Sequence, residues 1–266
     1  MARRAAAVNG WFSRRLAPGH VPGEKRRDLA LEGLRGVCAC LVLYGHMTIP
    51  GARLDPQFAP SARLWWLNLG ITAVLFFFVL SGYVIGLSVR SPFTAPGAGR
   101  YLWRRFLRLA PVNCAAVLLS WLFLPQVGPG TVVGNLSFLQ NFKAYPFGWY
   151  VDVMPDNLNL WSLNFEALYY VAFVAVWWLA PMRGPLFIVA AAAAVGSTFL
   201  PGDHVMASAY LVGALYWLAG LGAAWLAPRD GRPGNWPSAL LAMAVMWPLA
   251  PLQRLLYWAH VPDLVA

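Results

Sequence analysis

The sequence is poor in charged side chains. Charged residues make up 11% of its 266 residues, and only ten are acidic, whereas soluble domains carry about a quarter. Hydrophobic residues make up 59%. A soluble core of this length is too small to bury them, because surface-to-volume scaling limits burial. The composition therefore excludes an ordinary soluble protein and indicates an integral membrane protein.

Cysteine is also scarce. The three cysteines, Cys38, Cys40 and Cys114, lie within apolar stretches and form no C-x-x-C pair. This pattern argues against a disulfide framework or a cysteine-bound metal, and it is typical of small packing residues. We expect no metal.

Acidic residues are outnumbered by Lys and Arg, which gives a formal net charge of +10. Such a charge is often a sign of nucleic-acid binding. Here the basic residues cluster beside apolar runs, where cytoplasmic retention and anionic lipid head groups explain them. We therefore expect a lipid bilayer, and no nucleic acid, as the partner of these charges.

Long apolar runs, separated by helix-breaking residues, predict about seven transmembrane helices. They cover residues 29–47, 64–89, 103–124, 158–180, 186–200, 208–227 and 236–258. A shorter apolar stretch at 131–142 cannot cross a bilayer and is expected to be re-entrant or interfacial. The predicted fold is an all-α, polytopic transmembrane bundle over residues 29–266, preceded by a basic cytoplasmic segment over residues 1–28.

The distribution of Lys and Arg predicts the orientation. With the N-terminus inside, the inner segments hold the basic N-terminal cluster and most arginines of residues 90–108, while the loops on the other side hold few. This bias follows the positive-inside rule. The N-terminus is therefore expected in the cytoplasm. The Arg-Arg pairs of residues 1–28 are not followed by a signal-type apolar region and cleavage site, so we expect no removed signal. The expected location is a bacterial cytoplasmic (inner) membrane.

Ionisable residues within membrane spans are expensive, so each is a functional candidate. The first span holds Glu32, Arg35 and His46. Arg35 and His46 are eleven residues apart, which places them on one helix face about 16 Å apart along the axis. This arrangement suits a donor with an anionic group at the cytoplasmic end and a reactive carbon deeper in. The plainer alternatives are a snorkelling arginine and an interfacial histidine, and for Glu32 a local ion pair with Arg35.

Four segments, in order, resemble the motifs of the acyltransferase-3 family of membrane proteins. The segments are LALEGLRGVCACLVLYGH at 29–46, FFFVLSGYVIG at 76–86, RYLWRRFLRLAP at 100–111 and LWSLNFEALYY at 160–170. The first contains the family's central motif, a cation and a histidine separated by ten residues. Each match alone is weak, but four in the expected order are specific. The resemblance covers roughly residues 29–180.

The resemblance implies roles for individual residues. It implies that His46 is the general base that takes a proton from an acceptor hydroxyl, a task that suits an imidazole. It implies that cytoplasmic arginines hold the phosphates of coenzyme A, and we carry this role to Arg105 and Arg108, with Arg35 on the first span. Guanidinium groups match phosphate geometry. For Arg105, topology signalling alone is an equal explanation.

Two further residues of these motifs have open roles. Glu166 is a catalytic candidate that can orient the imidazole, stabilise its protonated form or pair with Arg35, or it can belong to a structural buried network. Ser81 lacks the G-x-S-G and G-x-S-x-G patterns of serine hydrolases. With Gly82 and Gly86 spaced as G-x-x-x-G, it is expected to allow close helix packing.

The family resemblance implies a membrane-bound O-acyltransferase, with acetyl as the first expectation for the acyl group. It would use acyl-CoA as co-substrate, need no other cofactor, and modify a hydroxyl of a carbohydrate or glycoconjugate. The family usually has about ten spans, and the deficit here falls after Glu166. This departure leaves open a short member, a truncated inactive homologue or a site completed by a partner. A non-enzymatic transporter or exporter using the same polar residues is the other alternative.

Overall fold

The protein is described by a computed structural model. It describes residues 28–54, 69–124, 126–140, 143–144, 149–155, 157, 160–179, 189–193, 196, 205–227 and 236–248. The helices are α2 (Leu29–Leu54), α4 (Gly70–Ser88), α5 (Ala95–Phe123), α6 (Pro129–Leu136), α7 (Trp161–Trp178), α9 (Val205–Leu226) and α10 (Trp236–Met246). Two strands of two residues each, β1 (Lys143–Ala144) and β2 (Trp149–Tyr150), pair with each other in antiparallel fashion. The architecture confirms the predicted all-α class.

Four helices of the described part are long and apolar enough to cross a membrane. They cover Leu29–Met47, Gly70–Ser88, Ala95–Phe123 and Ala209–Leu226, and each overlaps a predicted span. Helices α7 and α10 lie within two further predicted spans. Most of the predicted span at 186–200 and the second half of that at 236–258 lie outside the described residues. A membrane protein with several spans is thus supported, and the total of seven stays a prediction.

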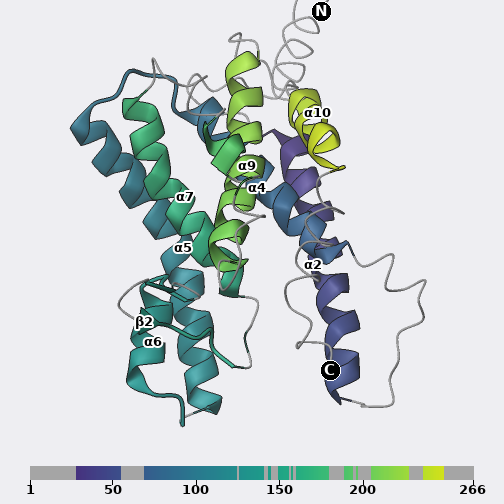
Figure 1. Ribbon diagram of the computed structural model, residues 1–266, viewed down its shortest axis with the longest axis vertical. Coiled ribbons are helices and arrows are strands. Elements are labelled where there is room, and N and C mark those ends of the chain that lie inside the picture. Colours follow the sequence, from purple (N-terminus) through teal and green to yellow (C-terminus); the bar gives the residue numbers. More distant parts are fainter. Residues whose placement is uncertain are drawn as a thin grey trace, which may run out of the picture.

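Helix α4 is the centre of the bundle. Figure 1 shows α4 and α9 in the middle, with α5 and α7 on one side and α2 and α10 on the other. Helix α4 packs against α2, α7, α9 and α10. Its sequence contains no charged residue and is hydrophobic on all sides, which is the pattern of a helix surrounded by other helices.

The contact between α4 and α9 depends on glycine. A Cβ atom added at Gly82 would overlap the carbonyl of Trp217, and one added at Gly220 would overlap that of Val79. Gly86 lies one turn further along the same contact. Small residues allow the two backbones to touch, as in other membrane helix pairs. The prediction that Gly82 and Gly86 permit close packing is confirmed.

Aromatic side chains attach α7 to α4 and α9. The ring of Phe78 meets that of Tyr169 edge to face, with centroids 5.3 Å apart, and Phe165 stacks on Tyr210 at 4.1 Å. The Tyr169 hydroxyl also donates to the Tyr210 carbonyl at 2.9 Å. The ring contacts fix the rotation of α7 about its axis and therefore the direction in which its polar residues point.

The short helix α6 packs beside α5 and has eight residues, too few to cross a bilayer. The Asn135 side chain donates to the carbonyls of Thr131 (2.8 Å) and Asp152 (2.7 Å) and accepts from the Met154 amide at 3.3 Å. Asn113 of α5 donates to the Asn135 carbonyl at 2.9 Å. Buried irregular backbone is tolerated where protein groups satisfy its hydrogen bonds, and these carboxamides do so.

Candidate active site

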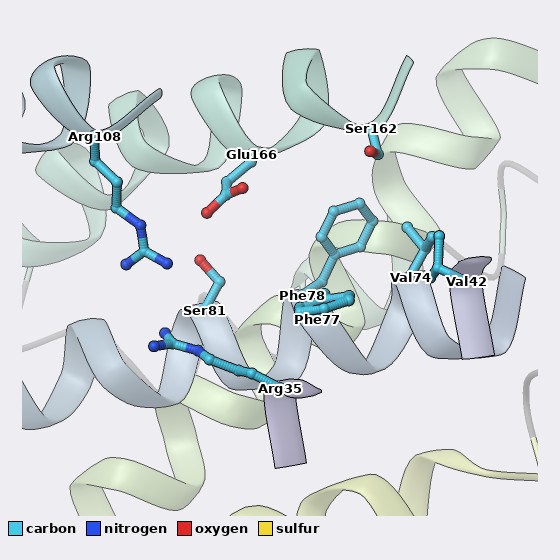
Figure 2. A pocket seen from close by; sticks show the side chains of 9 residues that line it. All are labelled: Arg35, Val42, Val74, Phe77, Phe78, Ser81, Arg108, Ser162 and Glu166. Atoms are coloured by element: carbon cyan, nitrogen blue, oxygen red, sulfur yellow. The ribbon is translucent and has the colours of Figure 1, made fainter. Parts of the chain in front are cut away.

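A cavity of about 250 Å³ lies between α2, α4, α5 and α7. The side chains that line it are Arg35, Val42, Val74, Phe77, Phe78, Ser81, Arg108, Ser162 and Glu166. Figure 2 shows that charged and apolar side chains occupy different ends of this cavity. We call these the charged end and the apolar end.

The charged end collects one polar side chain from each of four helices. Arg35 comes from α2, Ser81 from α4, Arg108 from α5 and Glu166 from α7. In Figure 2 the Arg108 guanidinium, the Glu166 carboxylate and the Ser81 hydroxyl point toward one space, with the Arg35 guanidinium beside it. Residues that are far apart in the sequence, from 35 to 166, therefore meet here.

The charged end lies on the side predicted to face the cytoplasm. Ser81 is seven residues, or about 10 Å, before the end of α4 at Ser88. The loop that follows leads into the arginine-rich start of α5. Arg108 stays exposed although it lines the cavity, so the cavity is open at this end. The Arg108 guanidinium is thus accessible from outside the bundle, at the end that the sequence predicts to face the cytoplasm.

The apolar end is formed by α2 and α4. Val42 of α2 faces Val74, Phe77 and Phe78 of α4, and Ser162 at the start of α7 adds one hydroxyl. Arg35 and Val42 are seven residues apart, so the cavity extends about 10 Å along α2. A flexible, uncharged segment of a ligand fits this end because it offers no charge to be satisfied.

Arg35 has a partner at the surface as well as a place in the cavity. Its Nη1 donates to Glu32 Oε1 at 2.9 Å, and the two side chains are 19% and 57% exposed. The predicted local ion pair between Glu32 and Arg35 is confirmed. A pair this exposed contributes little stability. Arg35 therefore makes this pair and lines the cavity at the same time.

His46 lies on the same stripe of α2 as Arg35 and Val42. The helix is continuous from Leu29 to Leu54, so His46 is one turn beyond Val42, about 6 Å further along the axis. Its side chain is half-buried and is not among those that line the cavity. The catalytic role of His46 stays a prediction, with the residue placed beyond the apolar end.

The Arg105 side chain points toward two tyrosine rings, whereas the Arg108 side chain lines the cavity. The Arg105 guanidinium lies over the rings of Tyr101 and Tyr170, at 5.4 and 5.3 Å from their centroids. It also donates to the Ser88 hydroxyl at 3.3 Å. Arg105 is not among the residues that line the cavity, although sequence spacing places it on the same side of α5 as Arg108.

Two side chains near the charged end were not singled out as polar site residues from the sequence. The Tyr170 hydroxyl donates to Glu166 Oε1, and a tyrosine four residues after a carboxylate on a helix is a signal for such a contact. The Ser81 hydroxyl is buried and makes no hydrogen bond of good geometry within the described residues, although the Tyr170 hydroxyl is its neighbour. Ser81 was expected only to pack, and it also lines the cavity.

Comparison with known proteins adds independent information. Residues 28–264 match a family described as an acyltransferase domain. BcsY of Komagataeibacter xylinus, named as a membrane-bound transacylase, is 28% identical over 244 residues, which cover 84% of this chain and 57% of that protein. The acyltransferase MdmB of Streptomyces mycarofaciens is 28% identical over 153 residues, covering 54% of this chain and 38% of MdmB. The chain thus spans little more than half of the first relative's length and less of the second's. No solved structure matches.

Proposed function

Because this chain belongs to the acyltransferase family that its residues 28–264 match, we propose that it is a membrane-bound O-acyltransferase. It moves an acyl group, in the simplest case acetyl, from acyl-CoA to a hydroxyl of a carbohydrate or glycoconjugate. Its site faces the cytoplasm of a bacterial inner membrane at the charged end. The names of two relatives, a transacylase and an acyltransferase, agree with group transfer.

One observation carries the proposal. Two guanidinium groups from separate helices, Arg35 and Arg108, meet at the open end of a cavity that runs along α2 toward His46. A guanidinium binds phosphate through paired, charge-assisted hydrogen bonds. Acyl-CoA has the matching chemistry, because it carries its phosphates at one end of a long, largely uncharged arm and its thioester at the other. The arm would lie in the apolar end.

The proposed reaction takes place near His46. The imidazole accepts the proton of the acceptor hydroxyl while that oxygen attacks the thioester carbonyl carbon. The tetrahedral intermediate then collapses, its carbon–sulfur bond breaks, and the coenzyme A sulfur leaves with the electron pair. The imidazolium returns its proton to that sulfur. The products are an ester and a free thiol, with atoms and charge balanced.

Glu166 has a different environment from His46. It shares the charged end with Arg35 and Arg108, and its carboxylate is about as far along the bundle as Arg35. Its place in the cavity is beside the guanidinium groups, although no atom of Glu166 lies within 4.0 Å of either in an ion pair. The carboxylate lowers the net charge of this end from +2 to +1, which reduces the repulsion between two cations in an apolar surrounding.

The test is mass spectrometry of envelope glycans and small glycosides. Cells that contain the protein should yield products heavier by one acyl group, and cells without it should not. His46→Ala should remove these products, because loss of a general base lowers rates by about 10²- to 10⁴-fold. The variant must accumulate in membranes at the wild-type level. Retained turnover in His46→Ala membranes rules out this base. Substrate flux that continues without acyl-CoA supports an exporter instead.

A further inference from the structure

The Glu166 carboxylate shares a cavity with two guanidinium groups and pairs with neither. Within the part of the chain that the structure describes, the one ion pair with atoms within 4.0 Å joins Arg35 to Glu32. Glu166 Oε1 instead accepts a hydrogen bond from the Tyr170 hydroxyl, one helical turn away on α7. A carboxylate with nearby cations normally forms charge-assisted bonds with them. Its orientation toward Tyr170 therefore requires an explanation.

Tyr170 is itself held on several sides. Its side chain is 3% exposed, and its ring lies against that of Tyr101 with centroids 6.5 Å apart, close to edge to face. The Arg105 guanidinium lies over both rings, and Ser88 anchors that guanidinium from the end of α4. The hydroxyl of Tyr170 therefore has a fixed position, and a hydrogen bond to it fixes one carboxylate oxygen of Glu166.

We propose that Tyr170, supported by Arg105, is a restraint that holds Glu166 away from Arg35 and Arg108. A carboxylate that swung onto either guanidinium would occupy the donors that a phosphate needs, because both anions use the same planar fork. The restraint keeps the Arg108 guanidinium, and the Arg35 donors that Glu32 does not occupy, available for a phosphate-bearing anion. The inference rests on the proposed function in taking acyl-CoA as that anion. It gives Arg105 a positioning role.

The restraint predicts a specific order of acetyl-CoA affinities among three variants. Tyr170→Phe frees Glu166 to pair with Arg108 or Arg35, so acetyl-CoA should bind about tenfold more weakly, the size expected when a charge-assisted hydrogen bond to the ligand is lost. Glu166→Gln should bind acetyl-CoA at least as tightly as the wild type. The double variant Glu166→Gln/Tyr170→Phe should regain the affinity of Glu166→Gln, because a neutral amide does not compete for the guanidinium groups. Defects that come from misfolding do not cancel in this way.

The neighbouring residue provides a matched control. Tyr169 is as buried as Tyr170, and its hydroxyl donates to the Tyr210 carbonyl, outside the cavity. Tyr169→Phe should therefore leave acetyl-CoA affinity within about twofold of wild type. Arg105→Lys removes the planar group above the two rings and should weaken binding in the same direction as Tyr170→Phe, but less. Arg100→Lys, on the exposed side of α5, should not.

The measurement is equilibrium dialysis of acetyl-CoA, and separately of inorganic pyrophosphate, against the detergent-solubilised full chain. Equal affinities for Tyr170→Phe and Tyr169→Phe overturn the restraint, and so does a double variant as weak as Tyr170→Phe. A protein that binds neither probe also overturns it. If the wild type and the variants show the expected order of acetyl-CoA affinities, but the wild type transfers no acyl group in a separate assay, the proposed function fails and the restraint stands. If the pattern appears with pyrophosphate alone, the anion site stands and the donor is not acyl-CoA.

Discussion

The two sides of α4 have opposite properties. Toward α9 the helix is closed and uncharged, and its glycines bring two backbones into contact. Toward α2, α5 and α7 it borders an open cavity with two guanidinium groups and one carboxylate. Ser81 and Gly82 are adjacent in sequence but about 100° apart on the helix, and each belongs to one side. From this comparison we expect stability to depend mainly on the α9 side and the proposed ligand binding on the other.

The largest effect is expected on the closed side. Gly220→Ala places a methyl group against the Val79 carbonyl and should destabilise the protein by about 1–3 kcal/mol, the range typical of overpacking. Gly222→Ala, two residues away, meets no atom within 4 Å and is the control. Thermal unfolding in detergent measures both. Equal unfolding temperatures for the two variants would contradict the importance of the α4–α9 contact.

The next effect concerns Arg108 on the open side. Arg108→Ala should weaken acetyl-CoA binding about tenfold or more, since a charge-assisted phosphate contact is lost. Acceptor affinity and the unfolding temperature should change little, because Arg108 is exposed. Equilibrium dialysis and unfolding of the same sample provide the comparison, with Arg100→Ala as control. Equal loss of donor and acceptor binding would indicate a folding defect.

A smaller effect is expected at Ser81, where the two sides meet. Its buried hydroxyl lacks a hydrogen bond of good geometry, and removing such a group is close to neutral or stabilising. Ser81→Ala should thus keep or slightly raise the unfolding temperature while weakening acetyl-CoA binding about twofold to fivefold, as expected for a single neutral hydrogen bond. A fall in unfolding temperature with unchanged affinity would assign Ser81 to packing alone.

The smallest effect is expected at Glu32. In its ion pair with Arg35, the Glu32 side chain is 57% exposed, so Glu32→Gln should alter stability by less than about 1 kcal/mol. Chemical denaturation in mixed micelles measures this change. Acetyl-CoA affinity should stay within about twofold of wild type, because Arg35 keeps its position in the cavity. A clear loss of affinity would mean that the pair orients Arg35 for the ligand.

Much of the helical framework followed from the sequence, because long apolar runs and their breakers are local signals. The shared face of Arg35 and His46 also followed, since it needs only the helical repeat. The difference between Arg105 and Arg108 did not. In the sequence, both arginines fit a cytoplasmic cluster on one side of a helix. Arg105 is held over the rings of Tyr101 and Tyr170, which lie on two different helices, and this contact separates it from Arg108.

The role of Ser81 was unpredictable for a related reason. The G-x-x-x-G spacing correctly indicated a packing face on α4, but the face to which the preceding serine belongs depends on where α5 and α7 lie. To predict the restraint of Glu166 from the sequence, one needs both a local spacing and knowledge of which helices pack together. The spacing of Glu166 and Tyr170 is readable, whereas the guanidinium above the Tyr170 ring comes from α5.

The length of α5 has a consequence for the depth of the charged end. Its 29 residues span about 43 Å, whereas the hydrocarbon core is about 30 Å thick. Helix α5 must therefore tilt or project into the head-group layer, and its arginine-rich first turns are the part suited to that layer. Arg108 then sits near the hydrocarbon boundary, at a depth that follows the tilt. Vesicles of different lipid chain lengths would test whether the accessibility of the Arg108 guanidinium changes with this tilt.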